Sequence, residues 1–61
     1  MTYSILSRNV DLYREYRKLR DAHSAAKRLS RNHPGESFVV RSPQGKRVST
    51  VKHNLIRWDA N

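Results

Sequence analysis

The residues of this sequence that are best suited to chemistry are its cations. Thirteen Lys and Arg stand against five Asp and Glu, which gives a net charge of +8. Between Ser37 and Trp58 there are five bases and no acid, and between Arg14 and Arg31 seven bases stand against two acids. Such an excess favours association with a polyanion or with an acidic protein surface.

Catalysis finds little support in the residue types present. The sequence has no Cys, no nucleophile elbow and no Gly-rich phosphate loop. Its five carboxylates are scattered along the sequence: Asp11, Glu15, Asp21, Glu36 and Asp59. The histidines His23, His33 and His53 lack the short spacing of zinc ligands, so we expect His23 and His33 to have surface or capping roles. We predict no catalytic residue, no metal and no cofactor.

Length and composition limit the kind of protein. We expect residues 1–61 to form one small domain. This domain is near the lower size limit for folding alone, because a chain this short buries only about 60% of its unfolded surface. Its thin core leaves two alternatives, marginal stability or added burial from a partner or a homodimer. No stretch resembles a signal peptide or a membrane span, and the lack of Cys suits a reducing compartment. We therefore expect a cytoplasmic protein with no membrane partner.

A helix ending at Pro34-Gly35 is the most clearly indicated element. Apolar residues recur at helical spacing along one side, at Leu19, Ala22, Ala25, Ala26 and Leu29. Bases lie along the opposite side, at Arg20, Lys27 and Arg31. The small inner residues would let this helix lie close to a sheet.

A β-hairpin follows the helix. "SFVV" has the composition of a strand, and Ser42-Pro43-Gln44-Gly45 has the preferences of a type I turn with a left-handed Gly. A three-residue loop with a bulge would place Ser42 opposite Lys46. The resulting register pairs Val40 with Val48 and Phe38 with Thr50 on the core side, and Arg41 with Arg47 and Val39 with Ser49 on the other side.

The N-terminal third allows two interpretations. "YSILSR" predicts a first strand, whereas "VDLYREYRK" fits either a second strand or the start of a long helix that ends at His33. Lys18 is a poor cap for a helix that starts at Leu19, but a helix of about 24 residues is twice the usual length. We predict an α+β fold of ββαββ type, an antiparallel sheet packed by one helix, with βαββ as the alternative.

Residues 53–61 are expected to form a C-terminal tail with no element longer than one turn. It carries Leu55, Ile56 and Trp58 close together. These side chains either cap an open edge of the core or anchor a partner or a second copy, because Trp is favoured at binding hot spots.

The basic residues are the candidate site. Arg41 and Arg47, if opposed, repel each other, and a phosphate between them would reverse the sign of that interaction. Lys46 lies beside this pair, and the helix adds Lys27, Arg31 and Arg20. The tyrosines Tyr3, Tyr13 and Tyr16 could stack on bases if exposed, but we expect Tyr16 to pack with Leu12 in so thin a core.

The chain also resembles a family of proteins. The sequence "LYREY", the spaced alanines before "HPGE", the strand "FVV" and "GKRV" resemble a diffuse group of very short bacteriophage and prophage proteins. The resemblance covers most of Tyr3 to Val51 and implies a hairpin, an Ala-rich helix and a second hairpin. In that group the helix usually opens with Thr or Ser, whereas this chain has Lys18. Some similarly sized phage proteins inhibit host defence complexes, including CRISPR effectors.

Two functional hypotheses follow. The first is a non-enzymatic accessory protein, in the host cytoplasm if phage-encoded, that binds DNA or RNA through phosphate contacts. The second is a protein inhibitor or adaptor, of anti-CRISPR or other anti-defence type, that sets the same positive surface against an acidic groove of a host nucleic-acid machine.

Overall fold

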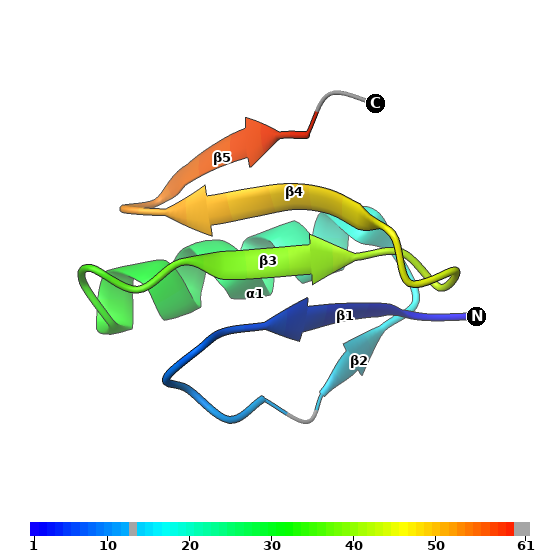
Figure 1. Ribbon diagram of the computed structural model, residues 1–61, viewed down its shortest axis with the longest axis horizontal. Helices are drawn as coiled ribbons and strands as arrows, with labels where there is room; N and C mark the ends of the chain where they lie inside the picture. Colours follow the sequence, from blue (N-terminus) through cyan, green and yellow to red (C-terminus); the bar gives the residue numbers. More distant parts are fainter. Residues whose placement is uncertain (13, 60–61) are drawn as a thin grey trace.

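The computed structural model describes residues 1–12 and 14–59 and shows an α+β fold, one helix packed on a five-stranded antiparallel sheet (Figure 1). The elements in chain order are β1 (Tyr3–Leu6), β2 (Glu15–Tyr16), α1 (Leu19–Asn32), β3 (Phe38–Arg41), β4 (Arg47–Lys52) and β5 (Leu55–Trp58). The strands lie side by side in the order β2-β1-β3-β4-β5. The predicted α+β class and the short helix are confirmed.

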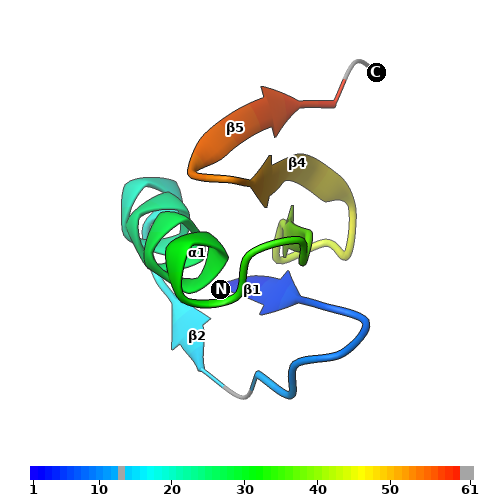
Figure 2. The same cartoon turned by 90° about the vertical axis from the view of Figure 1, so that its left-hand side faces the viewer.

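The helix covers only one face of the sheet (Figure 2). It begins at Leu19, so the alternative with one long helix is wrong. As its sequence suggested, Lys18 makes no side-chain capping bond, although its backbone has the extended conformation of an N-cap residue, with φ −114 and ψ 139. Asp21 lies in the first turn, where a carboxylate interacts favourably with the helix dipole.

The core lies between α1 and the inner face of the sheet. Its buried hydrophobic residues are Ile5, Ala22, Ala26, Phe38, Val40 and Val51. The two alanines are fully buried, which shows why small side chains are needed where the helix approaches the strands. Phe38 and Val40 were expected here, but the expected places of Val48 and Thr50 are wrong. Val48 is only half-buried, Ser49 takes its position opposite Val40, and Val51 lies opposite Phe38 where Thr50 was expected.

A bulge explains that difference. The turn has its predicted form, since Gly45 has φ 84 and its N–H donates to the Ser42 carbonyl at 2.9 Å. The register then shifts between Val40 and Arg41, so that Val40 lies opposite Ser49 and not opposite Val48. The predicted pairing of Arg41 with Arg47 is confirmed. The pairs farther from the β3–β4 turn are each displaced by one residue on β4.

The expected C-terminal tail contains a strand. Residues Leu55–Trp58 form β5 and pair with β4 after a two-residue turn at His53 and Asn54. Both turn residues have positive φ, 53 and 64, which is the type I′ geometry that matches the twist of a hairpin. Neither residue is Gly, so this turn lacked its strongest sequence signal. Within the described part of the chain, no helix is long and apolar enough to cross a membrane.

Candidate anion-binding face of the sheet

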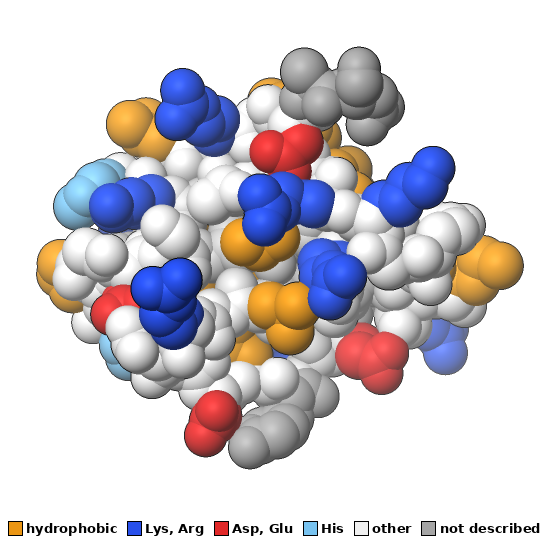
Figure 3. All heavy atoms as spheres, in the orientation of Figure 1, with side chains coloured by type: hydrophobic (Ala, Val, Ile, Leu, Met, Phe, Trp, Pro, Cys, Tyr) orange, Lys and Arg blue, Asp and Glu red, His pale blue; other side chains and the backbone are white. Residues whose placement is uncertain are grey.

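The side of the sheet opposite α1 is open, and we call it the outer face. Successive strand residues point to alternate sides, so the neighbours of the buried strand residues lie on this face. Its strand residues include Leu6, Val39, Arg41, Arg47, Thr50, Lys52, Leu55 and Arg57. The space-filling view of this side shows several Lys and Arg side chains around small apolar areas (Figure 3).

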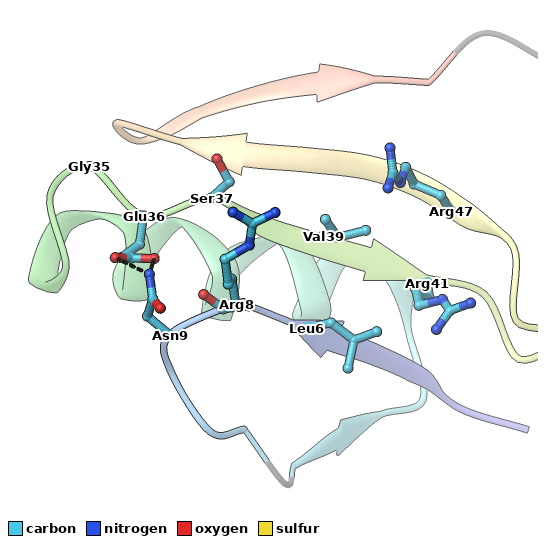
Figure 4. Close-up of a pocket in the computed structure, with 10 residues that line it drawn as sticks. Leu6, Arg8, Asn9, Gly35, Glu36, Ser37, Val39, Arg41 and Arg47 are labelled. Carbon is cyan, nitrogen blue, oxygen red and sulfur yellow. Dashed lines mark hydrogen bonds between the residues drawn. The ribbon is translucent and has the colours of Figure 1, made fainter.

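A shallow groove of about 840 Å³ crosses the outer face. Three arginines line it, Arg8 after β1, Arg41 at the end of β3 and Arg47 at the start of β4. Leu6 and Val39 lie between these arginines (Figure 4). The groove therefore combines concentrated positive charge with apolar surface.

One end of the groove carries an acid. Glu36 lines it, and both carboxylate oxygens accept hydrogen bonds from Asn9 Nδ2, at 3.0 and 3.1 Å. This contact joins the loop after β1 to the loop before β3 (Figure 4). Glu36 thus has a structural role, and anions are expected to bind toward the arginine end.

Arg41 stabilises the β3–β4 turn. Its Nε and Nη2 both donate to the Gly45 carbonyl, at 3.2 and 2.9 Å. This contact directs the guanidinium along the turn, and Figure 4 shows the Arg41 and Arg47 side chains pointing in different directions. The repulsion expected between the opposed arginines is therefore reduced by side-chain placement. The Nη1 group of Arg41 takes no part in these two bonds.

Arg47 has a weaker structural contact. Its Nε lies 3.9 Å from Asp59 Oδ2, which is within range of an ion pair but too long for a hydrogen bond. The Arg47 side chain is 65% exposed. Asp59 Oδ2 is shielded from solvent and accepts no hydrogen bond from a described residue, so the Arg47 charge offsets the burial of that oxygen. Most of the Arg47 side chain nevertheless remains open to an anion in solution.

Lys46 lies between these arginines in the chain. Its backbone holds the loop, because Ser42 N–H donates to the Lys46 carbonyl at 2.8 Å and Lys46 N–H donates to Ser42 Oγ at 3.2 Å. The residue is exposed, so its side chain extends the positive charge beyond the groove.

The predicted basic residues of the helix lie on α1, on the opposite side of the sheet from the outer face. Arg20 and Arg31 are exposed on α1, and Lys27 is half-buried there. Because α1 covers the inner face of the sheet, these residues do not join the outer face (Figure 2). The predicted set of bases is therefore divided between two surfaces.

Arg8 was not among the predicted site residues. It stands two positions after Leu6, so strand alternation could have assigned it to the same face. Its place in the same groove as Arg41 depends on β1 pairing with β3, which local sequence does not reveal.

A second groove, of about 390 Å³, lies between α1 and β5. Its lining residues are Leu19, Arg20, His23, Ser24, Lys27, Ile56 and Trp58. The Trp58 ring meets the His23 ring edge-on, with centroids 4.8 Å apart and an interplanar angle of 83°. Trp58 nevertheless stays 59% exposed, so it only partly covers the core.

The expected surface or capping role of His23 is wrong, because only 8% of this residue is exposed. Its Nε2 shares a hydrogen bond of 2.6 Å with Ser49 Oγ, across the helix–sheet interface. Burial, and then the nearby Lys27 ammonium, lower the pKa of His23 from its ordinary value. His33 does follow the expected capping role, since its N–H donates to the Leu29 carbonyl at the end of α1.

Neither Tyr3 nor Tyr16 offers a stacking platform on the outer face. Tyr3 and Tyr16 pair with each other on β1 and β2 and pack against the core, as Leu12 also does. Tyr13 lies outside the described residues. Among residues 1–12 and 14–59, no group of three or more His, Asp or Glu is placed to hold a metal ion.

Comparison with known proteins returned no family model, no curated protein and no solved structure that matches this chain. The resemblance to short phage proteins therefore stays a prediction. Inference about function rests on the chain's own residues and their placement.

Proposed function

We propose that the protein binds nucleic acid through phosphate contacts on the outer face of its sheet. The observation that carries this proposal is the groove that Arg8, Arg41 and Arg47 line from three separate segments. Phosphate oxygens match the planar donor fork of a guanidinium, which binds them through paired, charge-assisted hydrogen bonds.

Folding accounts for only part of this arrangement. Arg41 uses Nε and Nη2 to hold the turn, and Arg47 interacts weakly with Asp59. Arg8 is exposed and makes no hydrogen bond or ion pair with another described residue. Grouping three cations without an equal number of acids raises the energy of the free protein, and a bound phosphate chain would lower it.

The expected mode of binding is independent of base sequence. The outer-face residues of the described strands include no aromatic side chain, and single-stranded nucleic acids are usually held by stacking on such side chains. Contacts to phosphates position a protein on nucleic acid but carry no sequence information. Leu6 and Val39 would lie against the sugar edges between phosphates.

Salt dependence tests this function. Fluorescence anisotropy would follow binding of a labelled mixed-sequence DNA duplex and of an RNA of equal length. Three phosphate contacts on duplex DNA predict that raising salt from about 50 to about 200 mM weakens binding by about 40-fold. No binding at the lower salt concentration would overturn the proposal.

Charge reversal tests the location. We expect Arg8→Glu and Arg47→Glu each to weaken binding by about tenfold or more, because each replaces a phosphate contact by repulsion. Arg28→Glu is the matched control, since Arg28 is exposed on α1 and lines neither groove. Equal losses in all three variants would show a response to net charge alone and would overturn the assignment to this face.

A further inference from the structure

One edge of the sheet is formed by β5. β5 pairs with β4 on one side, and no described strand pairs with its other side. An unpaired edge presents N–H and C=O groups that can pair with an added strand. At the opposite edge, β2 has only two residues, so β5 offers the longer template.

The register shows which backbone groups face this edge. In an antiparallel pair, alternate residues direct both backbone polar groups to the same neighbour. Asp59 N–H donates to the Val48 carbonyl at 3.1 Å, which places the backbone of Arg57 toward β4 as well. Ile56 and Trp58 therefore direct their N–H and C=O groups toward the free edge.

Side chains on both sides of the edge are apolar and basic. On the helix side, Ile56 and Trp58 line the second groove together with Arg20 and Lys27. On the outer side, Arg57 lies beside Leu55, which is 72% exposed. Among the residues that the structure describes, no acidic one lines the second groove. An added strand would thus meet positive charge and apolar surface on both of its faces.

A second copy of the chain fits this edge poorly. Two β5 strands that pair through Ile56 and Trp58 in antiparallel fashion would bring Arg57 directly opposite Arg57 of the other copy. Like charges in that position are destabilising, and each copy carries a net charge of +8. A strand with acidic side chains would instead form opposite-charge pairs with the same residues.

We propose that the β5 edge binds an extended acidic peptide segment of a protein partner by strand addition. The peptide exchanges backbone hydrogen bonds with Ile56 and Trp58. Its apolar side chains pack on the exposed ring of Trp58, and its carboxylates pair with Arg57 on one face and with Arg20 and Lys27 on the other. Main-chain pairing supplies affinity in this mode, and the alternating side chains supply specificity.

A synthetic probe tests the edge directly. A capped peptide of about eight residues with the repeat Val-Val-Glu-Glu covers the whole strand and places both apolar side chains and carboxylates on each of its faces. A peptide of equal length with Lys in place of Glu serves as its control. Titration into the ¹⁵N-labelled protein is expected to shift the amides of Ile56 and Trp58 and to protect them from hydrogen exchange. The lysine peptide is expected to cause no such change. No shift of these two amides at millimolar Val and Glu peptide would overturn the proposal.

Two pairs of variants separate strand addition from attraction by net charge. Ile56→Pro removes an N–H that faces the free edge, while Ile56→Ala keeps it, so only the proline variant is expected to lose binding. Arg57→Glu is expected to weaken binding about threefold to tenfold, whereas Arg28→Glu, at an exposed position of α1 that does not line this groove, should change it much less. Equal effects within either pair would overturn the proposal.

The free protein supplies a last check. Sedimentation equilibrium is expected to show a monomer whose Ile56 and Trp58 amides exchange rapidly. A dimer with these amides already protected would identify the occupant as a second copy and overturn the assignment to an acidic peptide. Because the nucleic-acid groove uses Arg8, Arg41 and Arg47, failure at the β5 edge leaves the proposed function untouched.

Discussion

The two faces of the sheet differ in how strongly folding constrains the residue types that they carry. On the inner face, Phe38, Val40 and Val51 are fully buried against α1, and even the polar Ser49 is buried and hydrogen-bonded. The outer face, one position along the same strands, is largely basic and open to solvent (Figure 3).

The contrast indicates where to look for function in so small a domain. Packing explains nearly every inner side chain, since a substitution there opens a cavity or leaves a buried polar group without a hydrogen-bond partner. The outer residues experience weak structural demands, such as the Arg41 contact with the turn, and therefore can be selected for a ligand. Substitutions in the two faces should consequently affect different measurements.

The largest expected effect is a difference in stability loss between substitutions at two adjacent residues that lie on opposite faces. Phe38→Ala should cost about 3–5 kcal/mol of unfolding free energy, because it removes a fully buried ring. That loss approaches the whole stability of a chain this size, roughly 3–9 kcal/mol. Val39→Ala, on the outer face, should cost less than about 1 kcal/mol. Urea denaturation followed by circular dichroism compares them, and similar midpoints would contradict the distinction between the faces.

The polar pair on the inner face predicts a dependence on pH. The lowered pKa of His23 means that the folded state takes up a proton less readily than the unfolded state. This contribution to stability is fully present above the unfolded pKa of about 6.5 and is lost as the pH falls from there through the folded pKa. The loss amounts to at most about 1.4 kcal/mol per pH unit for one proton.

Denaturation midpoints measured between about pH 7.5 and 5 check this expectation. His23→Gln should remove most of the pH dependence, although it also lowers stability throughout. His53→Gln is the matched control, since His53 is exposed in the β4–β5 turn and should leave the pH profile unchanged. A profile that persists in the His23 variant would show that another group titrates.

Local signals predicted those parts of the fold that depend on few residues. The end of α1 at Pro34, the turn at Ser42 to Gly45 and the opposition of Arg41 and Arg47 all follow from short sequence patterns, and the structure has each of them. The antiparallel sheet with one packed helix follows from the same elements.

Long-range pairing determined what the sequence did not reveal. The bulge beside Val40 moves Ser49 into the core, and only there does it meet His23. β5 forms through a turn without Gly, and Arg8 joins the groove only because β1 pairs with β3. Ser49 and Arg8 thus acquire their roles from residues more than 20 positions away, which periodicity within one element cannot indicate.

A smaller, stabilising effect is expected at the start of α1. Lys18 already has the extended backbone of an N-cap residue but makes no side-chain bond to the helix. Lys18→Ser should raise the unfolding free energy by about 1 kcal/mol, because its hydroxyl can accept a bond from a free N–H of the first turn. Lys18→Ala controls for loss of the lysine. Nucleic-acid affinity should change little in either, since Lys18 is remote from the outer-face groove.

The smallest expected effect separates the two roles of Arg41. Arg41→Lys keeps the charge but cannot reproduce both bonds to the Gly45 carbonyl, so it should cost about 0.5 kcal/mol of stability at this exposed site. Arg47→Lys should change stability less, because the contact with Asp59 is a charge interaction at 3.9 Å without a hydrogen bond and lysine keeps the positive charge. Both variants should lose some nucleic-acid affinity, since an ammonium lacks the guanidinium fork. If Arg47→Lys bound as tightly as the parent while Arg41→Lys bound more weakly, the phosphate would be held mainly by the turn arginine, and the groove would extend toward Gly45 rather than toward β4.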